Sequence, residues 1–218
     1  GNVYRLEGER FHHVADVGAR VTQMMADHED GMLICTLGRG VLQMEETGRI
    51  RALGGLPGKV YLSACRDSDG GLWLGAFGLG LVHRNPEGRV AVFTGREGLP
   101  DPHIYAILED GQMNLWCSSN TGIFRISRPS LREKLSRGGG FLAINRYGKE
   151  SGMRCLECNG GSQPSGICDS RGCVWFPTVR GLVCVQPMRS LANRTPPAIL
   201  VERMDVNGKV WTPEQGGG

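Results

Sequence analysis

The chain has 218 residues, a formal net charge of only +3, aromatic residues at 6% and 34 glycines. Lys and Arg are scattered among Asp and Glu, and aromatics are few, which argues against a nucleic-acid surface. No apolar stretch approaches the roughly 18 residues that span a membrane. The glycines recur between short apolar runs, which is typical of a protein with many tight turns.

Two apolar segments open the chain. Residues 3–6 and 11–14 are typical of the third and outer strands of a small sheet. We therefore expect the chain to begin in the middle of a structural repeat.

Four segments then follow one pattern: a short apolar strand, an acidic turn that ends in glycine, and an aliphatic residue followed by a large one. The turns span residues 27–31, 66–70, 109–111 and 168–172. The large residues are Ile34, Trp73, Trp116 and Trp175. Six or seven residues later a glycine opens another apolar run, at Gly40, Gly80, Gly122 and Gly181.

The large residues are separated by 39, 43 and 59 positions, and a period near 40 residues built of short strands is that of a β-propeller blade. In the second repeat the inner strand is predicted at residues 63–65 and the outer strand at 90–93. One four-stranded sheet cannot bury both faces, so the blades should stack with the tryptophans between them. Residues 129–136 predict at most a two-turn helix.

The predicted fold class is therefore all-β, with about four and a half propeller blades of four antiparallel strands. Because a propeller needs closure to protect its strand edges, these blades are expected to belong to a larger ring of about seven.

The first repeat departs from the others in this alignment. Ile34 stands where tryptophan is usual, and His28 stands where the turn carries Asp. The same alignment places Cys65 with Leu108, Ala26 and Ile167, which indicates a small core hydrophobe.

A long insertion, residues 128–163, separates the third repeat from the fourth and includes a strand-like segment at 141–144. Loops on a rigid scaffold often carry recognition. The insertion is interpreted either as such a loop or as decoration that supports the next domain.

Several stretches carry a family resemblance. They are Leu99-Pro100-Asp101, Ile104-Tyr105, Leu108-Glu109-Asp110, Asn114-Leu115-Trp116, Ser119-Asn120, Gly122-Ile123, Glu157-Cys158-Asn159-Gly160-Gly161, Gln163-Pro164 and Trp175-Phe176-Pro177-Thr178. Together they resemble the two-component regulator propeller repeat, which builds the periplasmic sensor regions of hybrid histidine kinases and related receptors. Residues 196–202 and 207–208 resemble the first strand of the Ig-like domain that follows such propellers.

The resemblance implies a domain division into propeller blades at 1–195 and a linker with the first Ig-like strand at 196–218. It implies a noncatalytic, periplasmic sensor segment of a bacterial two-component protein. The implied partners are the rest of the receptor polypeptide (Ig-like domain, transmembrane helix and kinase), a second copy of the chain, and a small-molecule or glycan ligand, but no nucleic acid.

Ligand contacts are expected from loop residues, namely His103, Tyr105, Asn120, Asn159 and Arg180. Two other functions stay open: a propeller enzyme similar to streptogramin lyases or hydrolases, and a scaffold that binds only protein. His103 is the best-placed histidine for catalysis, with Asp101 or Glu109 as its possible partner. Acids that recur in equivalent turns indicate turn hydrogen bonding, so neither a catalytic residue nor a cofactor is predicted.

Four of the eight cysteines loosely imitate a zinc-ribbon spacing, and these are Cys155, Cys158, Cys168 and Cys173. Their positions in the repeat favour structural thiols over a metal site. One disulfide and a zinc site remain the alternatives.

Overall fold

The computed structural model describes residues 1–27, 31–138, 142–187, 204–207 and 209–211. The chain divides into two compact units, Gly1–Pro187 and Met188–Gly218. Among the described residues, no helix has the length and apolar character needed to cross a membrane.

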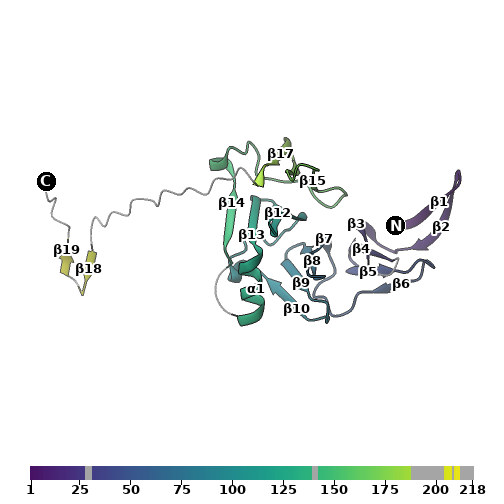
Figure 1. Ribbon diagram of the computed structural model, residues 1–218, viewed down its shortest axis with the longest axis horizontal. Coiled ribbons are helices and arrows are strands. Elements are labelled where there is room, and N and C mark those ends of the chain that lie inside the picture. The colour runs from purple at the N-terminus through teal and green to yellow at the C-terminus, as the bar shows by residue number, and fades with distance from the viewer. Residues whose placement is uncertain (28–30, 139–141, 188–203, 208, 212–218) are drawn as a thin grey trace. The chain divides into compact units, whose positions relative to one another are not determined.

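The first unit is a series of antiparallel sheets whose strands follow chain order (Figure 1). An N-terminal hairpin consists of β1 (Asn2–Glu7) and β2 (Arg10–Asp16). The first blade contains β3 (Arg20–Ala26), β4 (Met32–Leu37), β5 (Val41–Met44) and β6 (Ile50–Ala52). The second blade contains β7 (Tyr61–Arg66), β8 (Leu72–Ala76), β9 (Gly80–Arg84) and β10 (Val90–Phe93).

The third blade contains β11 (Ala106–Glu109), β12 (Asn114–Ser119), β13 (Gly122–Ser127) and β14 (Ile144–Tyr147). The fourth contains β15 (Ile167–Cys168), β16 (Val174–Thr178) and β17 (Gly181–Val185). One α-helix, α1 (Arg128–Arg137), precedes β14, and two single-turn 3-10 helices span Gly95–Glu97 and Lys149–Ser151. The all-β propeller prediction is confirmed, although the strand expected at 141–144 lies at Ile144–Tyr147 instead.

The second unit contains a short hairpin of β18 (Met204–Val206) and β19 (Lys209–Trp211). The predicted domain boundary at 195–196 and the Ig-like stretch at 196–202 lie outside the described residues.

A turn carboxylate organises each of the last three blades. In the second blade, Asp67 Oδ1 accepts hydrogen bonds from the backbone N–H groups of Asp69 (2.9 Å) and Gly71 (2.8 Å), while its Oδ2 accepts the Trp73 indole N–H at 2.8 Å. The same indole bond joins Trp116 to Asp110 at 2.6 Å and Trp175 to Asp169 at 3.1 Å. The turn therefore fixes the position of the tryptophan six residues later.

The tryptophans fill the interfaces between consecutive blades. Trp73 is 2% exposed and packs with residues of the third blade, and Trp116 is fully buried with Val174 and Phe176 of the fourth. Trp175, predicted to be buried in the same way, is only partly buried. The reason is that no further blade among the described residues covers its side of the sheet.

The first blade is shifted by one residue from the predicted alignment. Met25 pairs with Leu33 as Cys65 pairs with Trp73, so Leu33 and not Ile34 holds the tryptophan position. Leu33 packs against the second blade, whereas Ile34 packs with residues of the N-terminal hairpin. Successive strand residues point to opposite faces, so a shift of one residue exchanges the two interfaces.

The same shift makes Asp27, and not His28, the turn carboxylate of the first blade, and makes Met25, and not Ala26, the counterpart of Cys65. The Asp27 N–H donates to Gly31 at 2.9 Å, as the Asp67 N–H donates to Gly71. With leucine at the tryptophan position, the Asp27 carboxylate instead accepts from Gln43 at 2.9 Å and pairs with Arg66 of the next blade.

Helix α1 is held by an ion cluster centred on a buried arginine. Arg128, its first residue, has a side chain only 2% exposed and pairs with Asp67 at 3.2 Å, Asp69 at 2.6 Å and Glu109. Arg132, one turn later, also pairs with Asp69, and this hydrogen bond together with Arg128 lowers the pKa of the Asp69 carboxyl. The cluster joins the helix to the second and third blades.

Replacing Trp116 with Ala should lower the free energy of unfolding by about 3–5 kcal/mol, as large deletions in closed cores do. Trp175→Ala should cost clearly less, because a partly exposed side chain buries less apolar area. Urea denaturation with an unchanged m-value measures both. Equal losses would contradict the difference in burial between the two interfaces.

Arg128→Met should cost about 3–5 kcal/mol of unfolding free energy, because it leaves the carboxylates of Asp67 and Glu109 without their counter-charge. Arg132→Met is the matched control: it removes the same charge one helical turn away, from an exposed side chain, and should change stability little. The same urea titration compares them. A loss for Arg132→Met as large as that for Arg128→Met would show that burial of the ion cluster is not the cause.

Candidate functional site

All five predicted ligand residues lie on one face of the blades. Antiparallel strands place the turn between the second and third strands of every blade at the same end, opposite the acidic turns. Asn120 lies in that turn of the third blade and Arg180 in that of the fourth. Tyr105 and Asn159 reach the same end, since the Tyr105 N–H donates to Ser118 and the Asn159 N–H donates to Pro177, both at 2.9 Å.

A pocket of about 490 Å³ opens on this face and is called here the mouth pocket. It is lined by Arg20, Leu37, Val60, Leu62, Phe77, Tyr105, Gly160 and Gly161. Its walls thus come from the first three blades and from the loop that precedes the fourth. Most of the lining is apolar, with two aromatic rings and one guanidinium.

Tyr105 is the polar aromatic wall of the mouth pocket. Its hydroxyl donates to Asn120 Oδ1 at 2.6 Å, which fixes the ring and uses one acceptor of the predicted ligand residue. Burial raises the pKa of Tyr105, and the Asn120 hydrogen bond opposes that rise. The phenol is therefore present as a neutral hydrogen-bonding group at neutral pH.

His103 stands beside the mouth pocket. Its ring lies edge-on to Phe77, with centroids 4.4 Å apart, and Phe77 itself lines the pocket. Asp101 is 4% exposed, and its Oδ1 lies 3.1 Å from His103 Nδ1 and 2.8 Å from the His103 backbone N. Of the two carboxylates suggested for His103, the structure brings Asp101 to it.

The loop before the fourth blade forms the remaining wall of the mouth pocket. The Asn159 side chain donates to the Thr178 carbonyl at 3.1 Å, so this predicted ligand residue holds the loop to the fourth blade. Gln163 Nε2 donates to the Met24 carbonyl at 2.9 Å and its Oε1 accepts the Met24 N–H at 2.8 Å. The loop is thereby tied to the fourth blade and to the first.

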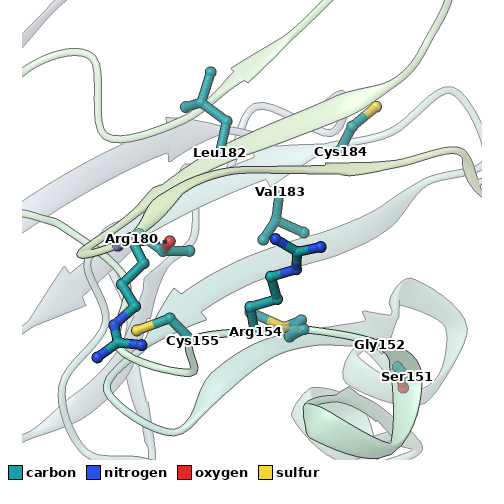
Figure 2. Close-up of a pocket in the computed structure, with 10 residues that line it drawn as sticks. Ser151, Gly152, Arg154, Cys155, Arg180, Leu182, Val183 and Cys184 are labelled. Atoms are coloured by element: carbon teal, nitrogen blue, oxygen red, sulfur yellow. Dashed lines mark hydrogen bonds between the residues drawn. The ribbon is translucent and has the colours of Figure 1, made fainter.

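A second pocket of about 320 Å³, called here the arginine pocket, lies at the fourth blade (Figure 2). Arg154 and Arg180 enter it together with Cys155, and β17 contributes Leu182, Val183 and Cys184. Arg180 is therefore separated from the other predicted ligand residues, which gather at or near the mouth pocket.

The eight cysteines are free thiols. Burial raises the pKa of Cys35 and Cys65 to about 12 and that of Cys158 to about 11. Within the described part of the chain, no three His, Cys, Asp or Glu side chains gather as metal ligands would.

Sequence reasoning missed most of the mouth-pocket lining. Nothing in the sequence marks Arg20, Leu37 or Val60 as functional. Phe77 could have been noticed as an aromatic residue in a tight turn, and in the structure it is 53% exposed. Arg154 lay in the insertion at 128–163, one of whose two interpretations was recognition.

Comparison with known proteins gives one family match and a shared fold. Residues 55–78, which include β7, the acidic turn and β8, match the family model "Two component regulator propeller". A search of curated proteins finds no match.

Two solved structures from B. thetaiotaomicron are extracellular domains of proteins described as hybrid two component systems. The first aligns with a TM-score of 0.69 at 23% identity, covering 96% of this chain and 28% of the other. The second has a TM-score of 0.63 at 17% identity, with 94% and 30% covered. A catalytically inactive virginiamycin B lyase from Staphylococcus aureus, solved with quinupristin, has a TM-score of 0.51 at 18% identity, with 76% and 55% covered. The chain thus spans less than a third of the first two structures.

Gly160→Ala should disturb the mouth pocket directly. A Cβ at this position would overlap Cβ, Cγ and Cδ1 of Tyr105, so the tyrosine side chain or the loop must move. We expect a loss of about 1–3 kcal/mol in stability and a shift of the Tyr105 ring signals in NMR spectra. Gly111→Ala is the control, because its Cβ would meet nothing within 4 Å. An unshifted Tyr105 ring in Gly160→Ala would contradict the close packing.

Proposed function

Because the chain carries the repeat of the two-component regulator propeller family, we propose that it is a noncatalytic sensor segment on the extracytoplasmic side of a bacterial two-component signalling protein. The two B. thetaiotaomicron domains support the location, since both are described as extracellular parts of such systems. The output domain, a kinase reached through a transmembrane helix, belongs to the rest of the receptor polypeptide.

The mouth pocket is the observation that carries this proposal. A concave, mostly apolar site of about 490 Å³ with a few fixed polar groups has the size and character of a small-molecule site. Phe77 and Tyr105 offer flat apolar rings, and the Tyr105–Asn120 pair offers oriented polar atoms. A small neutral ligand such as a short glycan matches this combination.

Signalling requires that the ligand bind two states of the receptor with different affinity. The mouth pocket is suited to this role because its walls come from different blades and from the loop that precedes the fourth blade. A ligand that contacts all of them favours one relative placement of the blades. That preference is what the following domain and the kinase would read.

The enzyme alternative rests on one observation, the contact between Asp101 and His103 beside the mouth pocket. A carboxylate that orients a histidine is the arrangement of many general bases. The Asp101 carboxylate, however, also accepts the His103 backbone N–H, as a side chain that stabilises a turn does. The similarity to virginiamycin B lyase is weaker than that to the extracellular domain of the first B. thetaiotaomicron protein, with TM-scores of 0.51 and 0.69.

Calorimetric titration with maltotriose, xylotriose and mannotriose tests the sensor proposal. At least one should bind, and Phe77→Ala with Tyr105→Ala should weaken that binding at least tenfold by removing both rings. Phe11→Ala is the matched control, because this ring is 73% exposed on β2 and away from the pocket lining.

Two results would count against the proposal. One is binding that the Phe77 and Tyr105 variants leave intact. The other is turnover of δ-gluconolactone, p-nitrophenyl acetate or p-nitrophenyl glucoside that disappears in His103→Ala, which would establish the enzyme instead.

A further inference from the structure

The arginine pocket brings two guanidinium groups to one small cavity. In Figure 2, Arg154 extends from its loop toward the strand that carries Val183, while Arg180 extends from the turn before β17 toward the loop that carries Cys155. The two cations therefore enter from different walls. An anion bound in this cavity would be attracted by both positive charges.

In the described part of the chain, no carboxylate pairs with either of these arginines. Within the described residues, neither guanidinium forms an ion pair or a side-chain hydrogen bond. Of the nearest acids along the chain, the Glu150 carboxylate lies beside Gly148, and the Glu157 carboxylate is near enough to Tyr105 for its charge to raise the pKa of that phenol. Arg128, by contrast, forms ion pairs with three carboxylates.

Both arginines stand on backbone that is already fixed. Arg180 lies two residues after Thr178, whose hydroxyl accepts the Arg180 N–H at 3.3 Å and donates to the Gly181 carbonyl at 3.0 Å. Arg154 follows Met153, whose side chain is 7% exposed and whose N–H donates to Gly148 at 3.0 Å. A site whose backbone is held before binding loses less entropy when a ligand arrives.

The rest of the cavity defines the kind of anion. Met153 and Val183 give it an apolar side beside the Arg154 guanidinium, whereas Leu182 points to the other face of β17 in Figure 2. A volume of about 320 Å³ lies at the lower end of the range for small-molecule sites. Guanidinium groups form paired, charge-assisted hydrogen bonds with planar or tetrahedral oxyanions.

We infer that the arginine pocket binds a small organic oxyanion, a carboxylate or a sulfate ester carried on a body about the size of one sugar ring. Arg154 and Arg180 hold the oxyanion, and the apolar side accommodates the body. This site is separate from the mouth pocket, so it stands whether or not that pocket binds a neutral ligand.

Calorimetry with D-glucuronate, D-glucose 6-sulfate and neutral D-glucose tests the inference on the full chain. One or both anions should bind, and glucose should bind at least tenfold more weakly. Whichever anion binds identifies the carboxylate or the sulfate as the recognised group. Raising the salt concentration should weaken the binding, because charge attraction is screened.

Arg154→Gln and Arg180→Gln should each weaken anion binding at least tenfold, and the double variant should abolish it. Arg51→Gln is the matched control: it removes the same charge from an exposed position on β6 and should leave the affinity unchanged. Because both arginines are exposed, we expect the variants to keep the melting temperature of the unmodified protein, which would exclude a folding defect.

Any of these results would overturn the inference: equal affinity for glucuronate, glucose 6-sulfate and glucose; anion binding that survives in the double variant; or a loss in Arg51→Gln as large as that in Arg180→Gln. Loss of anion binding in Tyr105→Ala with none in the arginine variants would also overturn it, by placing the anion in the mouth pocket.

Discussion

A buried indole N–H must find an acceptor, and this requirement links the turns of the propeller to its cores. In the last three blades the turn aspartate supplies the acceptor, and its other oxygen accepts two backbone N–H groups of the turn. Leaving such a group unpaired inside a core would cost about 1–3 kcal/mol. One carboxylate therefore shapes the hairpin, places the tryptophan and sets the face that meets the next blade. The first blade has leucine instead, and its aspartate bonds Gln43 and Arg66.

The blade pattern was predictable because tryptophan and turn aspartate mark the register wherever both are present. The first blade lacks the tryptophan, and Leu33 and Ile34 are chemically too alike to show which one faces the second blade. Gly40 and Gly80 are 40 residues apart, and this is also the separation between Leu33 and Trp73, the residues that occupy equivalent positions in the first two blades. The acidic turn alone does not reveal this alignment. Partial exposure of Trp175 could not be predicted, because burial depends on a neighbouring sheet and not on the local sequence.

The candidate site was predictable in its location more than in its composition. Tyr105 and Asn120 could be predicted as ligand residues because they lie in stretches that resemble the propeller repeat, and the fold brings them into contact. The opposite walls come from Arg20, Leu37 and Phe77, which approach Tyr105 only through the stacking of three blades. The arginine pocket likewise combines residues of the insertion with residues of β17, and no spacing in the sequence indicates that these two segments lie together.

The tie between Gln163 and Met24 repeats one found inside the propeller. The Gln23 side chain donates to the Ala64 carbonyl at 2.8 Å and accepts the Ala64 N–H at 2.9 Å. Ala64 is the second-blade counterpart of Met24. Gln163 thus makes the same pair of hydrogen bonds to the inner strand of the first blade (β3) that Gln23 of β3 makes to the inner strand of the second blade (β7). The contact spans 139 residues of sequence, so closing it requires a long loop and belongs among the slow steps of folding. Once closed, it shields an amide on a strand edge from hydrogen exchange, and the protection of that amide reports on the order of a loop far along the chain.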